Sequence, residues 1–246
     1  MLYRTYGQLR TELELDLDIQ DESAITPDEL VGIYNKAVDE CEAEIHTLHE
    51  DYFLNDHQPT LVVGTAAYAM PSDIYLNKIR GVVYESGTLI YEVKKIRNRF
   101  KFIDIQETNS FGTAEYYRYY IKNDAPTLAD SVITNNMKFM LVPTSREAGT
   151  PVTLWYLRQA NRVPLVTAGS QSASDDTVVD IPDFYAFVQK KAECLCLKKL
   201  EEYTALQIAL GELEQLRGQL RSTLSEMIED NDNEVELDMS HYKEHN

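Results

Sequence analysis

Three histidines beside a cysteine and a glutamate are the residues of this sequence best suited to chemistry. His46, His49 and His57 follow Cys41 and flank Glu50, and imidazole, thiolate and carboxylate groups are the usual ligands of Zn²⁺. In a helix, His46 and His49 would lie on one face because they are three residues apart. No C-x-x-C or H-E-x-x-H spacing completes a ligand set. A solvated helix face explains these residues, and no metal or cofactor is expected.

A run of acidic and amide residues near the C-terminus resembles the start of a calcium-binding loop. Its sequence is Asp230-Asn231-Asp232-Asn233-Glu234. Such a loop needs glycine at its sixth position and a bidentate acid at its twelfth. Val235 and His241 occupy these two positions. The sequence therefore predicts no EF-hand.

The patterns typical of enzymes are missing. The chain has no G-x-S-x-G, no phosphate-binding P-loop and no dinucleotide-binding glycine pattern. Acidic residues are so numerous that no pair stands out as a general acid and base. The five histidines suggest no partner for a nucleophile. We expect a protein that is not an enzyme, and an enzyme with a defined pocket is the weaker alternative.

A nucleic-acid-binding role is the other alternative. The tyrosine-rich segment Glu115–Tyr120 contains one arginine and could stack on bases, but half-buried strand residues are the preferred interpretation. The formal net charge is −18, which opposes general binding to phosphate backbones.

Composition indicates a folded protein. The 246 residues are 43% hydrophobic and include 16 tyrosines, enough for one large domain or two small ones. No apolar run reaches membrane-spanning length and no signal peptide is apparent, so we expect a soluble protein made in the cytosol. The three cysteines, Cys41, Cys194 and Cys196, lie in helical patterns and suggest no disulfide framework.

The charges are unevenly placed along the chain. Residues 1–56 hold 15 acidic against three basic side chains, and the end from Glu229 onward is again acidic. Residues 78–103 hold seven basic side chains against Glu85 and Glu92. Acidic ends and a basic middle favour contacts between copies or a partner of opposite charge, although ordinary solvated faces explain any single run equally well.

Helices are predicted at the N-terminal end. Residues 2–15 have apolar residues along one face, and residues 16–23 form an acidic linker. Thr26-Pro27-Asp28-Glu29 combines a capping threonine, a proline at the first helical position and a glutamate at the third. A helix is therefore predicted from Pro27 to about Glu50.

Short strands are predicted for the middle of the chain. Residues 80–84 and 89–93 are predicted to form a hairpin about Glu85-Ser86-Gly87-Thr88. Further strand-like segments are residues 60–63, 66–69, 116–121, 138–142 and 152–158, with a mixed segment at residues 100–105. Gly, Pro, Asn and Ser punctuate the region, which reads as a small antiparallel β-sandwich or barrel.

The last long stretch, residues 181–229, is helical in pattern and organises the chain. Its second part carries a heptad seam that Arg217 interrupts: Leu206, Leu210, Leu213, Leu220, Leu224 and Met227. One straight helix of this length would span on the order of 70 Å at about 1.5 Å per residue, which exceeds a compact core. We expect the chain to fold back near Tyr203–Thr204, in preference to a straight projecting rod.

These elements predict an α+β fold, in which N- and C-terminal helices form a bundle and the β region is inserted between them. The predicted parts are residues 1–58 (N-terminal helices), 59–170 (β domain), 171–229 (C-terminal helices) and 230–246 (flexible acidic segment). The heptad seam exceeds what one subunit covers, so the C-terminal helix or residues after it should order against a neighbouring copy or another partner.

The order of features resembles head–tail adaptor proteins of tailed bacteriophages. Tyr68-Ala69-Met70-Pro71-Ser72-Asp73 is similar to the Y-x-L-P-x-D-F phrase of that family, with methionine for leucine at 70 and isoleucine for phenylalanine at 74. Residues 152–157 look like the last strand of the family's β region, and residues 178–184 like the entry to its final helices. Tail tubular proteins of short-tailed phages and ring proteins of crAss-like phages are the relatives considered.

The resemblance implies a structural virion protein that forms a ring, commonly of twelve copies, between the portal and the tail or nozzle. Genomic DNA would pass through the ring without specific binding, and no membrane is involved. Another ring protein of the tail, such as a tail completion or nozzle-proximal protein, is the alternative. The expected contact residues are the six seam residues named above together with Arg97, Arg99 and Lys101.

Overall fold

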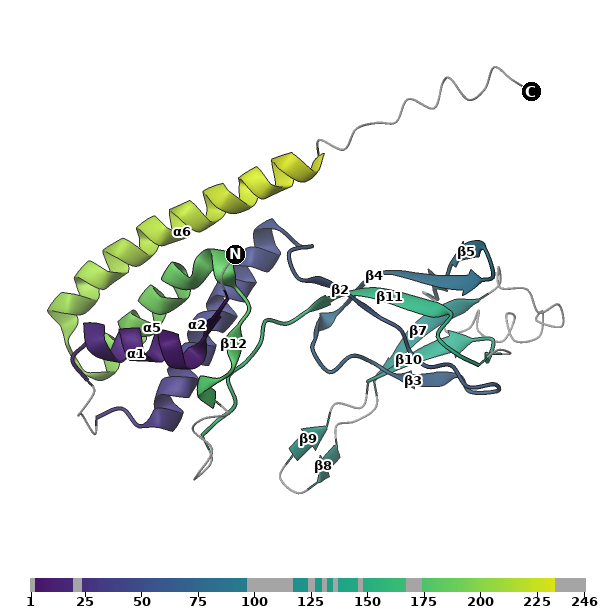
Figure 1. Cartoon of the computed structure of the whole chain (residues 1–246), viewed down its shortest axis with the longest axis horizontal. Coiled ribbons are helices and arrows are strands. Elements are labelled where there is room, and N and C mark those ends of the chain that lie inside the picture. Colours follow the sequence, from purple (N-terminus) through teal and green to yellow (C-terminus); the bar gives the residue numbers. More distant parts are fainter. Residues whose placement is uncertain are drawn as a thin grey trace, which may run out of the picture. The chain divides into compact units, whose positions relative to one another are not determined.

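The computed structural model describes residues 3–19, 24–96, 117–123, 127–129, 132–134, 137–145, 148–166 and 174–232. The chain divides into a helical unit, Met1–Tyr52 with Ala160–Asn246, and a β unit, Phe53–Gln159. Figure 1 shows the helices in one unit and most of the strands in the other. The fold is α+β, as the sequence predicts.

The helical unit is built from segments on both sides of the β unit in the sequence. Its elements are β1 (Arg4–Thr5), α1 (Tyr6–Asp16), α2 (Pro27–Leu48), β12 (Val178–Val179), η3 (Pro182–Phe184), α5 (Tyr185–Lys199) and α6 (Tyr203–Asp232). Helix α5 packs against α1, α2 and α6. The core of this unit therefore joins residues that are more than a hundred positions apart in the chain.

Helix α2 begins where its capping signal predicts. The Thr26 hydroxyl accepts a hydrogen bond from the Glu29 amide at 3.3 Å, and the Glu29 carboxylate accepts one from the Thr26 amide at 2.9 Å. These two bonds satisfy backbone donors that a helix start leaves without partners. The helix ends at Leu48, with His49 as its C-cap, close to the predicted end.

The N-terminal helix begins later than predicted. Arg4–Thr5 forms strand β1 and pairs antiparallel with β12, and α1 starts at Tyr6 behind a capping box of Thr5 and Gln8. The Tyr6 amide donates to the Thr177 carbonyl at 2.8 Å. The strand depends on backbone pairing with a distant segment, which apolar spacing does not reveal.

The last helical stretch folds back, as predicted. Helix α5 ends at Lys199, α6 begins at Tyr203, and Glu201 between them has a φ of 61°, in the left-handed region. The reversal lets α6 pack along α5 and also contact α2. Figure 1 shows α6 lying along the outside of the other helices of this unit.

The β unit contains two four-stranded sheets. Their strand orders are β3-β10-β7-β6 and β2-β11-β4-β5. The strands are β2 (Leu54–His57), β3 (Ala67–Ala69), β4 (Ile74–Ser86), β5 (Leu89–Glu92), β6 (Lys94–Lys95), β7 (Arg118–Asn123), β10 (Met137–Val142) and β11 (Val152–Arg158), with a separate hairpin of β8 (Thr127–Ala129) and β9 (Val132–Thr134). Pairing is antiparallel except between β6 and β7.

One apolar cluster takes residues from both four-stranded sheets. Its members include Tyr68, Tyr84, Tyr119, Phe139 and Leu154. Tyr84 stacks on Tyr117 with ring centroids 4.6 Å apart, and Tyr119 stacks on Phe139 at 5.5 Å. Several of the tyrosines seen in the sequence are thus core residues of strands.

Most of the predicted strands are present, but one predicted segment is not a strand, and strands β2 and β6 were not predicted. The hairpin about Glu85–Thr88 is confirmed as β4–β5, with Gly87 at a φ of 61°. Residues 60–63 are not a strand, because only Leu61 forms an isolated bridge, to Gly149. Hairpin β8–β9 was not predicted. The mixed segment at residues 100–105 lies outside the described residues.

Candidate interaction surfaces

The histidines that suggested a metal site are not brought together. His46 is buried in α2 with its Nε2 3.9 Å from Glu42 Oε1, His49 caps the same helix, and His57 ends strand β2 in the β unit. Within the described ranges, no group of three or more His, Cys, Asp or Glu side chains could hold a metal ion. His46 packs inside the helical unit, so the solvated face predicted from the sequence is wrong for this residue.

The three cysteines are free and buried. Burial raises the pKa of the Cys196 thiol to about 12 and also raises that of Cys41. Because the thiolate is the reactive form, these side chains act as apolar core residues. No helix in the described part of the chain is both long and apolar enough to cross a membrane.

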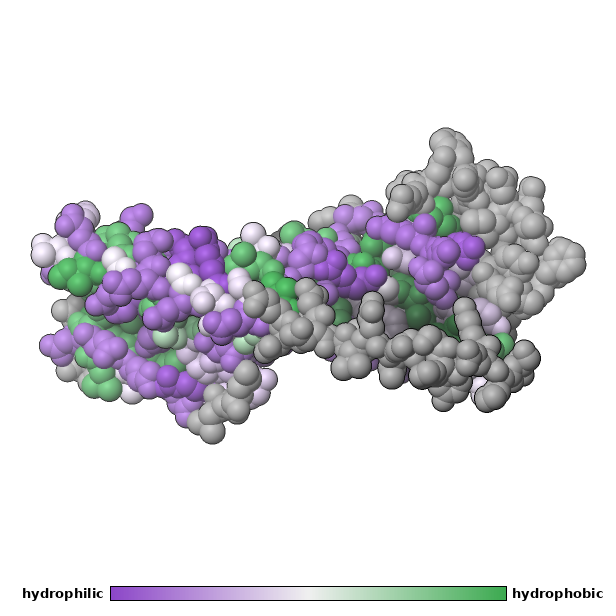
Figure 2. Space-filling model, turned by 90° about the horizontal axis from the view of Figure 1, so that it is seen from above, coloured by the Kyte–Doolittle hydropathy of each residue, from purple (hydrophilic) through white to green (hydrophobic). Residues whose placement is uncertain are grey.

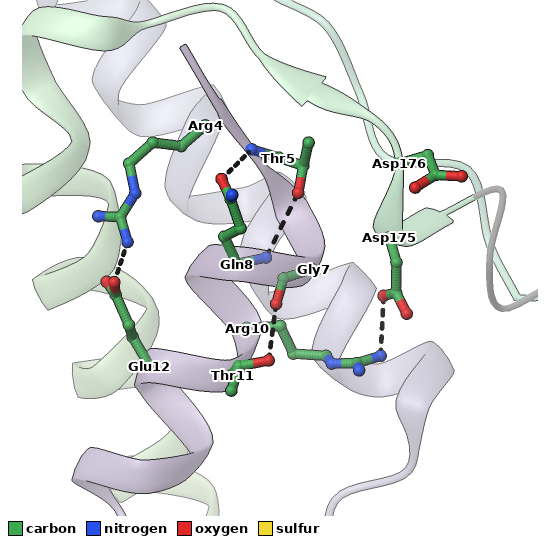
Figure 3. Close-up of a pocket in the computed structure, with 9 residues that line it drawn as sticks. All are labelled: Arg4, Thr5, Gly7, Gln8, Arg10, Thr11, Glu12, Asp175 and Asp176. Carbon is green, nitrogen blue, oxygen red and sulfur yellow. Dashed lines mark hydrogen bonds and ion pairs between the residues drawn. The ribbon is translucent and has the colours of Figure 1, made fainter. Parts of the chain in front are cut away.

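The helical unit has a groove of about 650 Å³ beside α1, lined by residues of β1, α1 and the segment Asp175–Asp176 (Figure 3). Arg10 Nη1 lies 2.8 Å from Asp175 Oδ1, and its Nε lies 3.4 Å from Glu14 Oε1. Arg4 pairs with Glu12. Figure 3 shows the pair of Arg4 with Glu12 and the pair of Arg10 with Asp175, of which the second joins α1 to the segment before β12.

Gly7 allows the two walls of this groove to meet. A Cβ atom at this position would lie 2.9 Å from Asp175 Cβ and 3.1 Å from the Asp175 carbonyl oxygen. The glycine therefore permits the close approach that brings Asp175 to Arg10. We assign the groove a structural role, because its charges hold α1 to the segment before β12.

A buried carboxylate clamps the returning chain to α2. Glu42 is 3% exposed, and its Oε1 accepts a hydrogen bond from the Ala160 amide at 2.6 Å while its Oε2 lies 2.5 Å from Arg162 Nη2. Arg162 Nη2 also lies 2.7 Å from Asp39 Oδ1. Asn35 exchanges two hydrogen bonds with the Val163 backbone, at 2.8 and 2.9 Å.

Sequence reasoning missed this clamp, although a signal was present. Asn35, Asp39 and Glu42 follow one another at four- and three-residue steps, so they share one helix face. A polar line at helical spacing beside an apolar stripe indicates a polar partner that runs along the helix. The partner here is residues 160–163, the first residues after the β unit.

Arg217, which interrupts the heptad seam, faces acidic residues of α2. Its Nη2 lies 2.9 Å from Glu40 Oε1 and its Nε 3.0 Å from Glu44 Oε1. Its guanidinium also lies over the Phe187 ring, 5.9 Å from the centroid. Lys191 of α5 reaches the same Glu40 at 2.5 Å. The interruption therefore orients α6 on α2 and α5.

The seam residues divide into two groups in the structure. Leu213, Leu220 and Leu224 are buried within the chain, whereas Leu206 and Met227 are half-buried and Leu210 is 45% exposed. The first group is accounted for by packing within the subunit. Contact with a partner stays a prediction, and Leu206, Leu210 and Met227 are the seam residues that remain accessible for it. Arg97, Arg99 and Lys101 lie outside the described residues.

The outward side of α6 combines apolar and small residues. Tyr203 and Ile208 are 62% and 65% exposed. A Cβ atom added at Gly211 or Gly218 would have no described atom within 4 Å, apart from its chain neighbours and the backbone of the same helix. The helix surface at both glycines is therefore open. Figure 2 shows the α6 side of the helical unit as mostly hydrophilic with scattered apolar residues.

The outer face of sheet β3-β10-β7-β6 gathers positive charge. Lys122 of β7 is directly opposite Lys138 of β10, and Lys94 of β6 is paired with Arg118 of β7. Directly paired residues point to the same side of a sheet. The intervening residues, such as Tyr119 and Phe139, are buried on the inner side. Four cations therefore share one outer face in a chain whose net charge is −18.

A family model described as SU10 adaptor protein matches residues 4–234, which include the β unit, most of the helical unit and the whole of α6. No curated protein matches the chain.

Proposed function

We propose, since the chain belongs to the SU10 adaptor protein family, that it forms a ring joining the portal of a phage head to the tail. The family is one of structural phage adaptors, so the chain is a virion component that interacts with other virion proteins. The single observation that carries the proposal is the extent of the match. It includes most of the helical unit, the β unit and the connection between them.

The architecture supports a ring subunit made of a helical bundle with an inserted β-sandwich. The helices on either side of the insertion pack on one another, and the cluster shared by the two sheets supplies the core of the sandwich. We propose that the helical unit contacts the portal and neighbouring copies, and that the β unit contacts the tail or nozzle. The ring would hold several copies, twelve by resemblance, assembled in the host cytoplasm.

The exposed residues of α6 support contact with a neighbour or the portal. Tyr203, Ile208 and Leu210 place large apolar side chains in solvent, and tyrosine and aliphatic anchors stabilise protein interfaces when a partner buries them. Leu206 and Met227 lie half-buried beside them. These residues would gain burial without any disruption of the core around Leu220.

The charge of the chain fits a passage for DNA. A surface with a net charge of −18 repels the phosphate backbone, so a duplex would pass through the ring without adhering to it. This is a structural role.

The native mass of the purified chain, alone and mixed with the portal protein of the same phage, tests the proposal. We expect a monomer alone and a stoichiometric ring on the portal. A chain that remains monomeric in the presence of the portal would overturn the portal-joining role. Ring formation only with a tail protein would favour the alternative, a ring protein of the tail.

A further inference from the structure

The reversal between α5 and α6 is made by residue types that favour a continuous helix. Leu200, Glu201 and Glu202 connect the two helices, and leucine and glutamate are among the strongest helix formers. A helix usually ends with glycine or asparagine in the left-handed region and begins behind Ser, Thr, Asp or Asn. Here Glu201 is the residue in the left-handed region, with a φ of 61°, and Glu202 precedes α6. The turn therefore has the usual signal at neither helix end.

The turn is a strained segment of backbone. The Glu202 amide donates to the Leu197 carbonyl at 3.0 Å, which closes the end of α5 around Glu201. A residue with a Cβ atom is disfavoured in the left-handed region by roughly tenfold. A straight helix through the turn would place Glu201 in the ordinary right-handed region and remove this cost. The packing of α6, and not the sequence of the turn, therefore maintains the reversal.

The apolar spacing continues across the turn without a skip. Two series of residues at seven-residue spacing lie along this stretch: Cys196, Tyr203 and Leu210, and Leu206, Leu213 and Leu220. The two series alternate at three- and four-residue steps, with Lys199 and Arg217 as interruptions, so one straight helix would carry them along a single seam. Two antiparallel helices need no common register of this kind. The sequence is therefore compatible with one long helix as well as with the reversal.

The contacts that hold α6 join it to groups that every copy of the chain carries. Glu212 Oε2 of α6 lies 2.8 Å from Lys190 Nζ of α5, and Arg217 Nη2 of α6 lies 2.9 Å from Glu40 Oε1 of α2. Buried leucines such as Leu220 supply the apolar part of the contact. A second copy presents the same groups, so α6 can make the same interactions there without any new surface.

We propose that Leu200–Glu202 is a hinge and that two copies of the chain exchange α6 through it. In the exchanged form, α5 and α6 of each chain join into one helix, residues 185–232, about 70 Å long. Its α6 part packs on α2 and α5 of the second copy. Exchange removes the strain at Glu201 and brings Tyr203, which is 62% exposed in the single chain, into the new contact between the two hinges. The inference goes beyond the proposed function, because it needs no portal.

The length of the hinge sets the concentration at which exchange occurs. A short connection holds α6 near its own chain at an effective concentration on the order of millimolar. Well below that concentration each α6 folds back, which gives a monomer. At about 1 mM a second copy competes with the chain itself, and relief of the strain at Glu201 then favours exchange roughly tenfold. Copies held side by side in an assembly meet the same condition.

Carbodiimide coupling of the full-length chain tests the exchange. Light and isotopically heavy protein are unfolded together in urea, refolded at about 1 mM, coupled, digested and measured by mass spectrometry. Coupled Lys190–Glu212 peptides report the contact of α5 with α6, and Lys191–Glu40 peptides report the contact of α5 with α2, which stays within one chain. We expect Lys190–Glu212 peptides that combine a light and a heavy half, and Lys191–Glu40 peptides that do not. Refolding at about 1 μM should remove the mixed peptides.

A glycine at the hinge provides the second arm. Glu201→Gly relieves the strain of the folded-back turn and weakens the straight helix, so it should reduce the share of mixed Lys190–Glu212 peptides at least about tenfold. The matched control is Gln215→Gly, at an exposed position of α6. That change weakens the helix equally in both forms, so the mixed share should equal that of the wild type.

Three results would overturn the exchange. They are the absence of mixed Lys190–Glu212 peptides at about 1 mM, an equal mixed share for Lys191–Glu40, and an unchanged mixed share in Glu201→Gly. Because the coupling uses no portal protein, its result is independent of the test of the proposed function. A complete ring on the portal without exchange refutes this inference alone, and exchange without a ring refutes the proposed function alone.

Discussion

A few single side chains hold the two sequence stretches of the helical unit, residues 1–52 and 160–246, against each other. Glu42 binds the Ala160 amide and Arg162, so one carboxylate fixes the point at which the chain returns from the β unit. The three cysteines are buried and their thiols are held in the neutral form, which gives them a packing role.

Replacing Glu42 with alanine should destabilise the protein strongly. The change leaves the buried Ala160 amide without an acceptor, which costs about 1–3 kcal/mol of unfolding free energy, and Arg162 keeps only its pair with Asp39. Urea denaturation followed by circular dichroism measures the change. The control is Glu212→Ala, whose exposed pair with Lys190 should contribute less than about 1 kcal/mol. Equal effects of the two variants would contradict the clamp.

Glu29 should make stability depend on pH in the acid range. Hydrogen bonds from the Lys199 ammonium and from Thr26 lower the pKa of this carboxyl to about 2, below the ordinary value of 4.5. A carboxyl whose pKa is lower when folded stabilises fully above its unfolded pKa, and the contribution is lost as the pH falls from about 4.5 through 2. The Tm of wild type should exceed that of Glu29→Gln at pH 6, and the difference should vanish near pH 2. A difference independent of pH would contradict this assignment.

Elements differ in how far the sequence predicts them. The start of α2 depends on Thr26 and Glu29, three residues apart, and such a local signal is visible in the sequence. The reversal between α5 and α6 could be predicted from the length of the helical stretch, because one straight helix of that length would extend beyond a single compact core.

Strand β1 could not be predicted from the sequence, because its partner β12 lies more than a hundred residues away. The ion pairs of Arg217 were not predicted for the same reason, because their partners, Glu40 and Glu44, lie in another helix far away in the sequence. The spacing of Asn35, Asp39 and Glu42 shows a polar face of α2 in the sequence. The sequence does not show that residues 160–163 bind this face. Of the predicted contact residues, the structure accounts for the buried leucines and leaves the exposed positions of α6 as predictions.

Substitutions at two leucines of α6 should affect stability and ring formation separately. Leu220 is 2% exposed, so Leu220→Ala should cost about 2–5 kcal/mol of unfolding free energy. Leu210 is 45% exposed, so Leu210→Glu should change stability by no more than about 0.5 kcal/mol yet reduce ring formation on the portal. Chemical denaturation and native mass spectrometry measure the two quantities. Normal rings from Leu210→Glu would remove this position from the interface.

At the scale of the whole molecule, the chain consists of an unbroken β unit and a helical unit assembled from two separate stretches. The β unit has its own apolar cluster, made from residues within 53–159. The N-terminal helices instead bury their apolar residues against α5, which is encoded after the insertion.

A fragment of residues 53–159 should therefore fold alone, and a fragment of residues 1–52 should not. Trp155, the single tryptophan of the chain, lies in β11 and reports on the β unit by its fluorescence. We expect a cooperative urea transition for the first fragment and none, by circular dichroism, for the second. A folded 1–52 fragment would contradict the dependence of α1 and α2 on α5.

The split helical unit also sets an order of events during translation. Residues 4–5 pair with residues 178–179, so strand β1 has no pairing partner until roughly 170 further residues have been translated. The β unit is complete well before that moment and can fold while the nascent chain is still attached. Until α5 emerges, the apolar face of α2 is exposed to solvent and is a place where chaperones that bind nascent apolar segments would act.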